Sequence, residues 1–139
     1  MRIISRLLFI LTLLAGCFTP AAFAADTDPL FVNLTTDDPH RANMGITFGL
    51  KQFQRGHPLT ILLNDKSVFI GAKAGAERFA MHQKLLADLI GKGATVLICP
   101  MCMKQYGITE ADLIPGVKLG SPEITGDALF KDNTKALSW

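Results

Sequence analysis

The sequence predicts an α/β fold with a parallel sheet covered by helices on both faces. Short, almost wholly apolar runs at 30–34, 59–63 and 94–98 are typical of strands that are buried on both sides. Between these runs lie segments 39–55 and 79–92, in which apolar residues recur at helical spacing. Strands that alternate with helices in this way favour parallel pairing through crossover helices.

The first predicted helix has a clear start and a clear stop. Asp38 is placed as its N-cap and Pro39 as its first residue, where the missing N–H of proline costs nothing. Gly56 ends it. After strand 59–63, segment 64–77 is rich in glycine and alanine and is interrupted by Val68-Phe69-Ile70. We interpret this segment as a partly ordered, mobile loop.

The C-terminal third alternates between short elements. We expect a short helix at 103–106, a helical turn at 110–113, a strand at 117–119, a helix at 122–130 and a terminal strand at 136–139. Nothing in the composition indicates a second domain, so residues 25–139 are predicted to form one domain.

The N-terminus resembles a secretory signal peptide. Arg2 and Arg6 precede an apolar run at 7–14 that is short for a membrane span, and Ala22-Phe23-Ala24 is a small-x-small cleavage pattern. We therefore expect residues 1–24 to be removed and the protein to be periplasmic. The alternative is lipidation, because Leu14-Ala15-Gly16-Cys17 resembles the lipobox of bacterial lipoproteins.

Removal of this segment changes the charge and the cysteine content. The whole chain has 14 basic and 12 acidic residues, and the loss of Arg2 and Arg6 leaves 12 of each. A mature chain without basic excess gives no reason to expect a nucleic-acid partner, and we expect no membrane span in it. Cys17 is lost as well, so Cys99 and Cys102 become the whole cysteine content of a protein in an oxidising compartment.

Cys99-Pro100-Met101-Cys102 follows the apolar run 94–98 directly. A Cys-x-x-Cys between a strand and a helix places thiols where free backbone N–H groups stabilise a thiolate, so we expect a lowered thiol pKa there. Lys104, one step beyond Cys102, is a further candidate for stabilising the thiolate, although most lysines are simply solvated.

Several chemistries fit such a pair of cysteines. A thiol–disulfide exchanger is one, but the motif follows the third strand and has no adjoining tryptophan or downstream cis-proline signal. Structural zinc needs four ligands and is a weak match. Copper(I) is softer, and Met101 and Met103 are possible thioether ligands, although methionines more often fill gaps in a core. A persulfide carrier and a purely structural thiol pair complete the alternatives.

Two successive segments resemble the reactive-cysteine region of DsrE-like sulfur-relay proteins. They are Cys99-Pro100-Met101-Cys102-Met103-Lys104-Gln105-Tyr106-Gly107-Ile108 and Asp112-Leu113-Ile114-Pro115-Gly116-Val117. This family includes DsrE, DsrF, TusD and YchN. Strand 30–34 and the Thr-Thr-Asp-Asp-Pro segment after it also resemble the family's opening, so the resemblance spans about residues 29–139. Tyr106 stands where the family usually has arginine.

The resemblance implies a flavodoxin-like, three-layer α/β/α fold with a five-stranded, mainly parallel sheet. It also implies a sulfur carrier or sulfurtransferase that exchanges sulfur with donor and acceptor proteins or small sulfur species and assembles as a trimer or hexamer. The family's cysteine corresponds best to Cys102, with Cys99 as an additional, resolving or tuning thiol. No resident cofactor or metal is implied.

Polar residues that follow the predicted strands are expected to share one rim of the sheet with the cysteines, because ligand sites of parallel sheets lie at the carboxyl ends of the strands. Asp37 and Asp38 lie there, although capping alone explains Asp38. His40, His57 and His82 show no metal-binding spacing, and no hydrolase triad, phosphate loop or nucleotide fingerprint is present.

Overall fold

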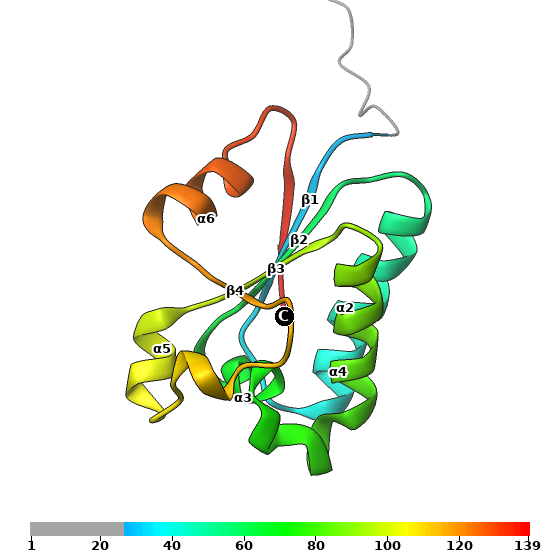
Figure 1. Cartoon of the computed structure of the whole chain (residues 1–139). Helices are drawn as coiled ribbons and strands as arrows, with labels where there is room; N and C mark the ends of the chain where they lie inside the picture. Colours follow the sequence, from blue (N-terminus) through cyan, green and yellow to red (C-terminus); the bar gives the residue numbers. More distant parts are fainter. Residues whose placement is uncertain (1–26) are drawn as a thin grey trace, which may run out of the picture.

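All five strands of the sheet pair in parallel, in the order β4-β3-β2-β1-β5 (Figure 1). The computed structural model describes residues 27–139, so the predicted signal peptide at 1–24 and Cys17 lie outside the described residues. The strands are β1 (Leu30–Leu34), β2 (Leu59–Leu63), β3 (Thr95–Ile98), β4 (Lys118–Leu119) and β5 (Lys135–Ser138). The predicted fold class is confirmed.

Helices lie on both sides of this sheet. The α-helices are α2 (Pro39–Gln54), α3 (Val68–Gly71), α4 (Ala76–Gly91), α5 (Pro100–Gln105) and α6 (Pro122–Leu129). Three short 3-10 turns complete the structure: η1 (Asp65–Ser67), η2 (Lys73–Gly75) and η3 (Glu110–Asp112). In Figure 1, α2 and α4 lie together on one side of the strands and α6 lies on the other.

The start of α2 follows the prediction. The Asp38 carboxylate accepts a hydrogen bond from the backbone N–H of Arg41 at 2.8 Å, and Pro39 is the first helical residue. Gly56, at φ +102°, takes the left-handed conformation that lets the chain turn away after the helix. Residues next to each end of α2 in the sequence, Asp38 and Gly56, therefore determine where the helix starts and stops.

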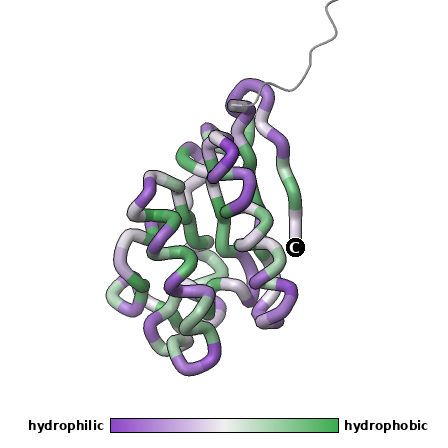
Figure 2. The backbone as a smooth tube through the Cα atoms, turned by 90° about the vertical axis from the view of Figure 1, so that its right-hand side faces the viewer, coloured by the Kyte–Doolittle hydropathy of each residue, from purple (hydrophilic) through white to green (hydrophobic). Residues whose placement is uncertain are grey.

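The core lies between the sheet and the pair α2/α4. Alternate strand residues point to this side, and three of them, Val32, Ile61 and Val96, have at most 1% of their surface exposed. Gly49 of α2 lets the helix approach closely, because a Cβ there would lie 3.2 Å from Leu59 and 3.7 Å from Val32. Figure 2 shows the hydrophobic backbone segments gathered inside and the hydrophilic ones at the bends.

The other face of the sheet is covered less completely. Phe31 and Leu97 are buried there, whereas Asn33, Thr60 and Leu62 are only half-buried. Helix α6, which lies on this side, has eight residues and none of them is buried. The two faces therefore differ, and the α6 side retains shallow hollows.

The interpretation of 64–77 as a loop is wrong. This segment forms η1, α3 and η2, and Val68 and Ile70 are fully buried. The Ser67 hydroxyl donates a hydrogen bond to the Leu34 carbonyl at 2.6 Å, which ties the segment to the end of β1. Its small residues reflect close packing, because a Cβ on Gly71 would lie 2.8 Å from Leu63.

The remaining boundaries shift by a few residues. Helix α4 begins at Ala76 rather than at residue 79, and α5 begins at Pro100 rather than at residue 103. Within residues 27–139, no helix combines the length and the apolar character that a membrane crossing requires.

Candidate functional site

The carboxyl ends of β1, β2 and β3 form the rim on which the cysteines lie. Hydrogen bonds between the strands continue past the strand ends. The Asn64 N–H donates to the Leu34 carbonyl at 2.8 Å, and the Cys99 N–H donates to the Leu63 carbonyl at 2.9 Å. The predicted common rim is confirmed, and backbone hydrogen bonds fix its geometry.

The two cysteines lie in one turn at the start of α5. Cys99 is the N-cap, and its sulfur accepts a hydrogen bond from the Cys102 N–H at 3.4 Å. The two Sγ atoms are 2.9 Å apart and both thiols are free. A disulfide has an S–S distance of about 2.05 Å, so only a small movement separates this pair from a bond.

Cys102 faces the turn that follows β2. Its Sγ lies 3.1 Å from the Asn64 side-chain oxygen and 3.2 Å from the backbone nitrogen of Asp65, which donates to it. Asp65 adopts φ +49°, a left-handed conformation that aspartate and asparagine tolerate better than most residues. In this turn the Asp65 N–H is shared between the sulfur of Cys102 and the Asn64 side-chain oxygen, which is 2.9 Å away.

Tyr106 supports the same turn from the other end of α5. Its hydroxyl donates a 2.6 Å hydrogen bond to the Asp65 carboxylate, and its ring contacts Phe69 with centroids 5.0 Å apart. The hydrogen bond to Asp65 is the main reason that the pKa of Tyr106 is raised. Tyr106 therefore connects the end of α5 to Asp65 and, through Asp65, to Cys102.

The pKa of Cys102 is raised, contrary to the lowered value that its position at a helix start predicts. Burial is the largest cause, followed by the hydrogen bond to Cys99. The Asp65 N–H acts in the opposite direction, while the negative charge of the Asp65 carboxylate raises the pKa further. Cys102 is thus held as a neutral thiol at neutral pH.

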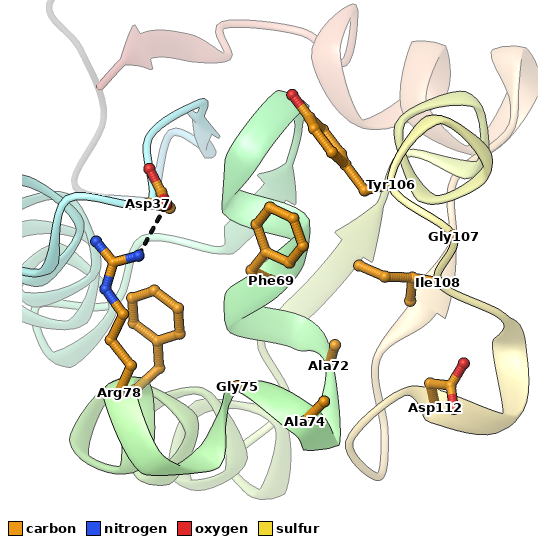
Figure 3. Close-up of a pocket in the computed structure, with 11 residues that line it drawn as sticks. Asp37, Phe69, Ala72, Ala74, Gly75, Arg78, Tyr106, Gly107, Ile108 and Asp112 are labelled. Carbon is orange, nitrogen blue, oxygen red and sulfur yellow. Dashed lines mark hydrogen bonds and ion pairs between the residues drawn. The ribbon is translucent and has the colours of Figure 1, made fainter.

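One cavity near the thiols is lined by neither cysteine. It measures about 580 Å³ and lies beside α3 and the end of α5 (Figure 3). Asp37 and Arg78 form an ion pair of 2.9 Å on one side of it, and Tyr106, Ile108 and Asp112 lie on the other. Asp37 therefore lines a neighbouring cavity rather than the thiol site.

A second hollow lies directly against Cys99. We call it the Cys99 groove; it measures about 460 Å³ and is lined by Leu62, Asn64, Cys99, Pro100, Met101, Gly120, Ser121, Pro122 and Thr125. It opens on the α6 side of the sheet, where α5 and α6 begin. Cys99 thus faces an open apolar surface, while Cys102 faces the Asn64–Asp65 turn.

The other candidate residues lie apart from the thiols. Lys104 is exposed on α5, and His57 and His82 each make a hydrogen bond to a backbone carbonyl, that of Asp28 and that of Pro39, both at 2.8 Å. Met103 is buried in the core, as a gap-filling methionine would be, but Met101 is 81% exposed. The part of the chain that the structure describes contains no group of three or more His, Cys, Asp or Glu residues arranged to hold a metal.

Two residues of the site, Asn64 and Asp65, were not predicted. They fall at the start of the segment interpreted as a loop, 37 or more residues from Cys102 in sequence. The available signal was their position as the first polar residues after a buried parallel strand, which places them on the rim.

Replacement of Asp65 by asparagine is expected to lower the pKa of Cys102 and that of Tyr106. The substitution removes the negative charge that raises both values, and asparagine keeps the left-handed backbone that presents the N–H. In a Cys99→Ser background, the iodoacetamide reaction of Cys102 should therefore move to lower pH and become severalfold faster at neutral pH. Asp88→Asn, on exposed α4 surface, is the matched control. An unchanged or higher midpoint would contradict this account.

Comparison with known proteins identifies the fold and the family. The solved structure of MTH1491 from Methanobacterium thermoautotrophicum, of unknown function, is similar with a TM-score of 0.64 and 14% identity over 81% of this chain and 99% of that one. The YchN protein from E. coli is similar with a TM-score of 0.56 and 16% identity, also over 81% of this chain and 99% of that one. At these identities the likeness concerns the fold.

Sequence comparison gives the family. Uncharacterized protein MJ0989 of Methanocaldococcus jannaschii is 30% identical over 95 residues, which cover 66% of this chain and 83% of that protein. Uncharacterized protein MK0008 of Methanopyrus kandleri is 33% identical over 82 residues, which cover 58% and 68%. The family model described as DsrE/DsrF-like matches residues 30–132, from the start of β1 to just before β5. The chain belongs to the DsrE/DsrF-like family.

Proposed function

We propose that the protein is a sulfur carrier, or a sulfurtransferase, that holds sulfane sulfur as a persulfide on Cys102, with Cys99 as the second thiol. The observation that carries the proposal is the free thiol pair, with sulfurs 2.9 Å apart, on the rim of a DsrE-like sheet. Membership of this family is consistent with sulfur relay, and these are the two cysteines of the described chain.

The surroundings of Cys102 suit a sulfur that is neutral at rest and negatively charged only during sulfur transfer. The raised pKa keeps the resting thiol neutral, which limits its reaction with unrelated electrophiles. When negative charge develops on a bound sulfur, the Asp65 N–H is already directed at this position. Loading is an exchange: the Cys102 sulfur bonds to the outer sulfur of a donor persulfide, the donor's S–S bond breaks, and the donor leaves as a thiol that takes the Cys102 proton.

The purified, reduced protein is expected to gain the mass of one sulfur atom, mapped to Cys102, after exposure to inorganic polysulfide or to an organic hydropersulfide. Cys102→Ser should lose the stable adduct, whereas Cys99→Ser should keep a Cys102 that can be loaded. Intact-mass and peptide mass spectrometry measure both. If neither donor adds sulfur to either cysteine, the sulfur-carrier proposal is wrong.

The short distance between the sulfurs also favours a second candidate, dithiol–disulfide exchange. In that function the same treatment would remove two hydrogen atoms and join Cys99 to Cys102, with no retained sulfur. The mass measurement therefore separates the two functions directly.

We further propose that the protein is exported to the periplasm and works there with sulfur donors and acceptors. Mass spectrometry of the mature protein should give a chain that begins at Ala25, because cleavage after Ala24 fits the small-x-small pattern of the sequence. A diacylglyceryl group on Cys17 would contradict free export and support the lipoprotein alternative.

We also propose assembly into a trimer or hexamer. All four residues of the edge strand β5 are exposed, and Phe48 and Leu137 line one shallow apolar hollow beside it. Exposed sheet edges and apolar patches are common sites of association. Light scattering of the purified protein should give the mass of three or six chains, and a monomer across the micromolar range would rule this assembly out.

A further inference from the structure

The two sulfurs of the pair face different surroundings. Cys99 lines the Cys99 groove, whereas the sulfur of Cys102 is directed at Asn64 and Asp65. A molecule that enters the groove therefore meets Cys99 first. The two sulfurs are 2.9 Å apart, so sulfur that arrives at Cys99 is within reach of Cys102.

The Cys99 groove contains no charged side chain. Its walls are apolar at Leu62, Pro100, Met101 and Pro122. A neighbouring hollow under α6 shares Leu62 with it, as well as Asn64 and Thr125, and also contains no charged residue. By contrast, the cavity of about 580 Å³ beside α3 has charged residues in its lining: Asp37, Arg78 and Asp112.

Two polar side chains of the groove, Ser121 and Asn64, already accept hydrogen bonds. The Ser121 hydroxyl accepts the Ile124 N–H at 3.1 Å, and the Asn64 side-chain oxygen accepts the Asp65 N–H at 2.9 Å. Pro100 and Pro122, the first residues of α5 and α6, have no N–H to offer. An anion such as thiosulfate would lose hydration here without meeting a cationic side chain.

The size of the groove suits a small molecule. Its volume of about 460 Å³ falls within the range of about 300–1,000 Å³ that is usual for small-molecule sites. Met101, which is 81% exposed at its edge, is an unbranched and adaptable side chain that can fold over an apolar ligand.

We propose that the Cys99 groove binds a low-molecular-weight organic persulfide whose organic group is uncharged, in its protonated form R–S–SH, and that Cys99 is the nucleophile that takes its sulfane sulfur. This inference rests on the proposed function. The Cys99 sulfur bonds to the outer sulfur of R–S–SH, the S–S bond of the donor breaks, and the donor leaves as R–SH with the proton that Cys99 gives up. The same exchange then moves the sulfur to Cys102: the Cys102 sulfur bonds to it, the bond to Cys99 breaks, and Cys99 regains a proton.

The test compares two donors that share the S–S–H group and differ in whether the organic group carries a carboxylate: benzyl hydropersulfide and 4-carboxybenzyl hydropersulfide, each released in situ. The rate at which each donor loads the protein is followed by mass spectrometry. It is divided by the rate at which the same donor transfers sulfur to free N-acetylcysteine, which corrects for the donors' intrinsic reactivity. We expect the uncharged donor to load the protein at least about tenfold faster after this correction, because the carboxylate finds no partner in the groove. Cys99→Ser should remove this preference and slow loading. Cys102→Ser, which lacks the thiol that holds the stable adduct, should still show the preference in a short-lived persulfide on Cys99 that is trapped by alkylation.

A positive charge placed in the groove tests the same preference from the side of the protein, with a matched control elsewhere. Met101→Lys should reverse or abolish the preference by favouring the carboxylate, while Met81→Lys, an exposed methionine on α4, should leave it unchanged. Equal loading by the two donors, or a preference that Met101→Lys does not alter, would overturn the inference and leave the sulfur-carrier proposal standing. A failure of both donors to load either cysteine would instead overturn the proposed function itself.

Discussion

The site depends on the parallel pairing of β2 with β1 and β3. This pairing brings the ends of three strands, which are far apart in sequence, to one rim, and its hydrogen bonds continue into the turns beyond. Asn64 is held against the end of β1, and Cys99 is held against the end of β2. A shift of register by one residue would turn alternate side chains to the opposite face and separate the Asp65 N–H from the sulfur of Cys102.

The sheet is covered unequally, and the two thiols reflect this difference. On the α2/α4 side, closely packed helices bury the inward-facing residues of β1, β2 and β3. On the α6 side, one short helix leaves hollows that reach the start of α5. Cys99 faces this open side and Cys102 faces a structured turn, so one strand-to-helix junction presents two sulfurs to two environments.

Most of the fold could be predicted from the sequence because its signals are local. Strands β1 and β2 have the predicted bounds, and the Asp38-Pro39 start of α2 is confirmed. The structure of segment 64–77 could not be predicted from local sequence signals. Its glycines and alanines indicate flexibility in isolation, but in the fold they allow Val68 and Ile70 to reach the core.

The site was only partly predictable for a related reason. The position of the thiols follows from their own neighbours in sequence, but the pKa of Cys102 depends on burial, on Cys99 and on Asp65, which becomes a neighbour only through the sheet. The local rule for a helix start predicts the opposite direction. The contact between Tyr106 and Asp65 spans 41 residues and likewise has no local signal.

The direction of β1 determines which end of the sheet lies near the start of the described chain and which end carries the thiols. The described chain enters at the amino end of this strand, and the thiols lie beyond the carboxyl ends of its parallel neighbours, at the opposite end of the sheet (Figure 1). Any attachment made ahead of residue 27, whether a lipid, a surface or a fusion partner, would therefore hold the molecule by the end remote from its sulfurs. The reactive rim would point outward, into the surrounding solution.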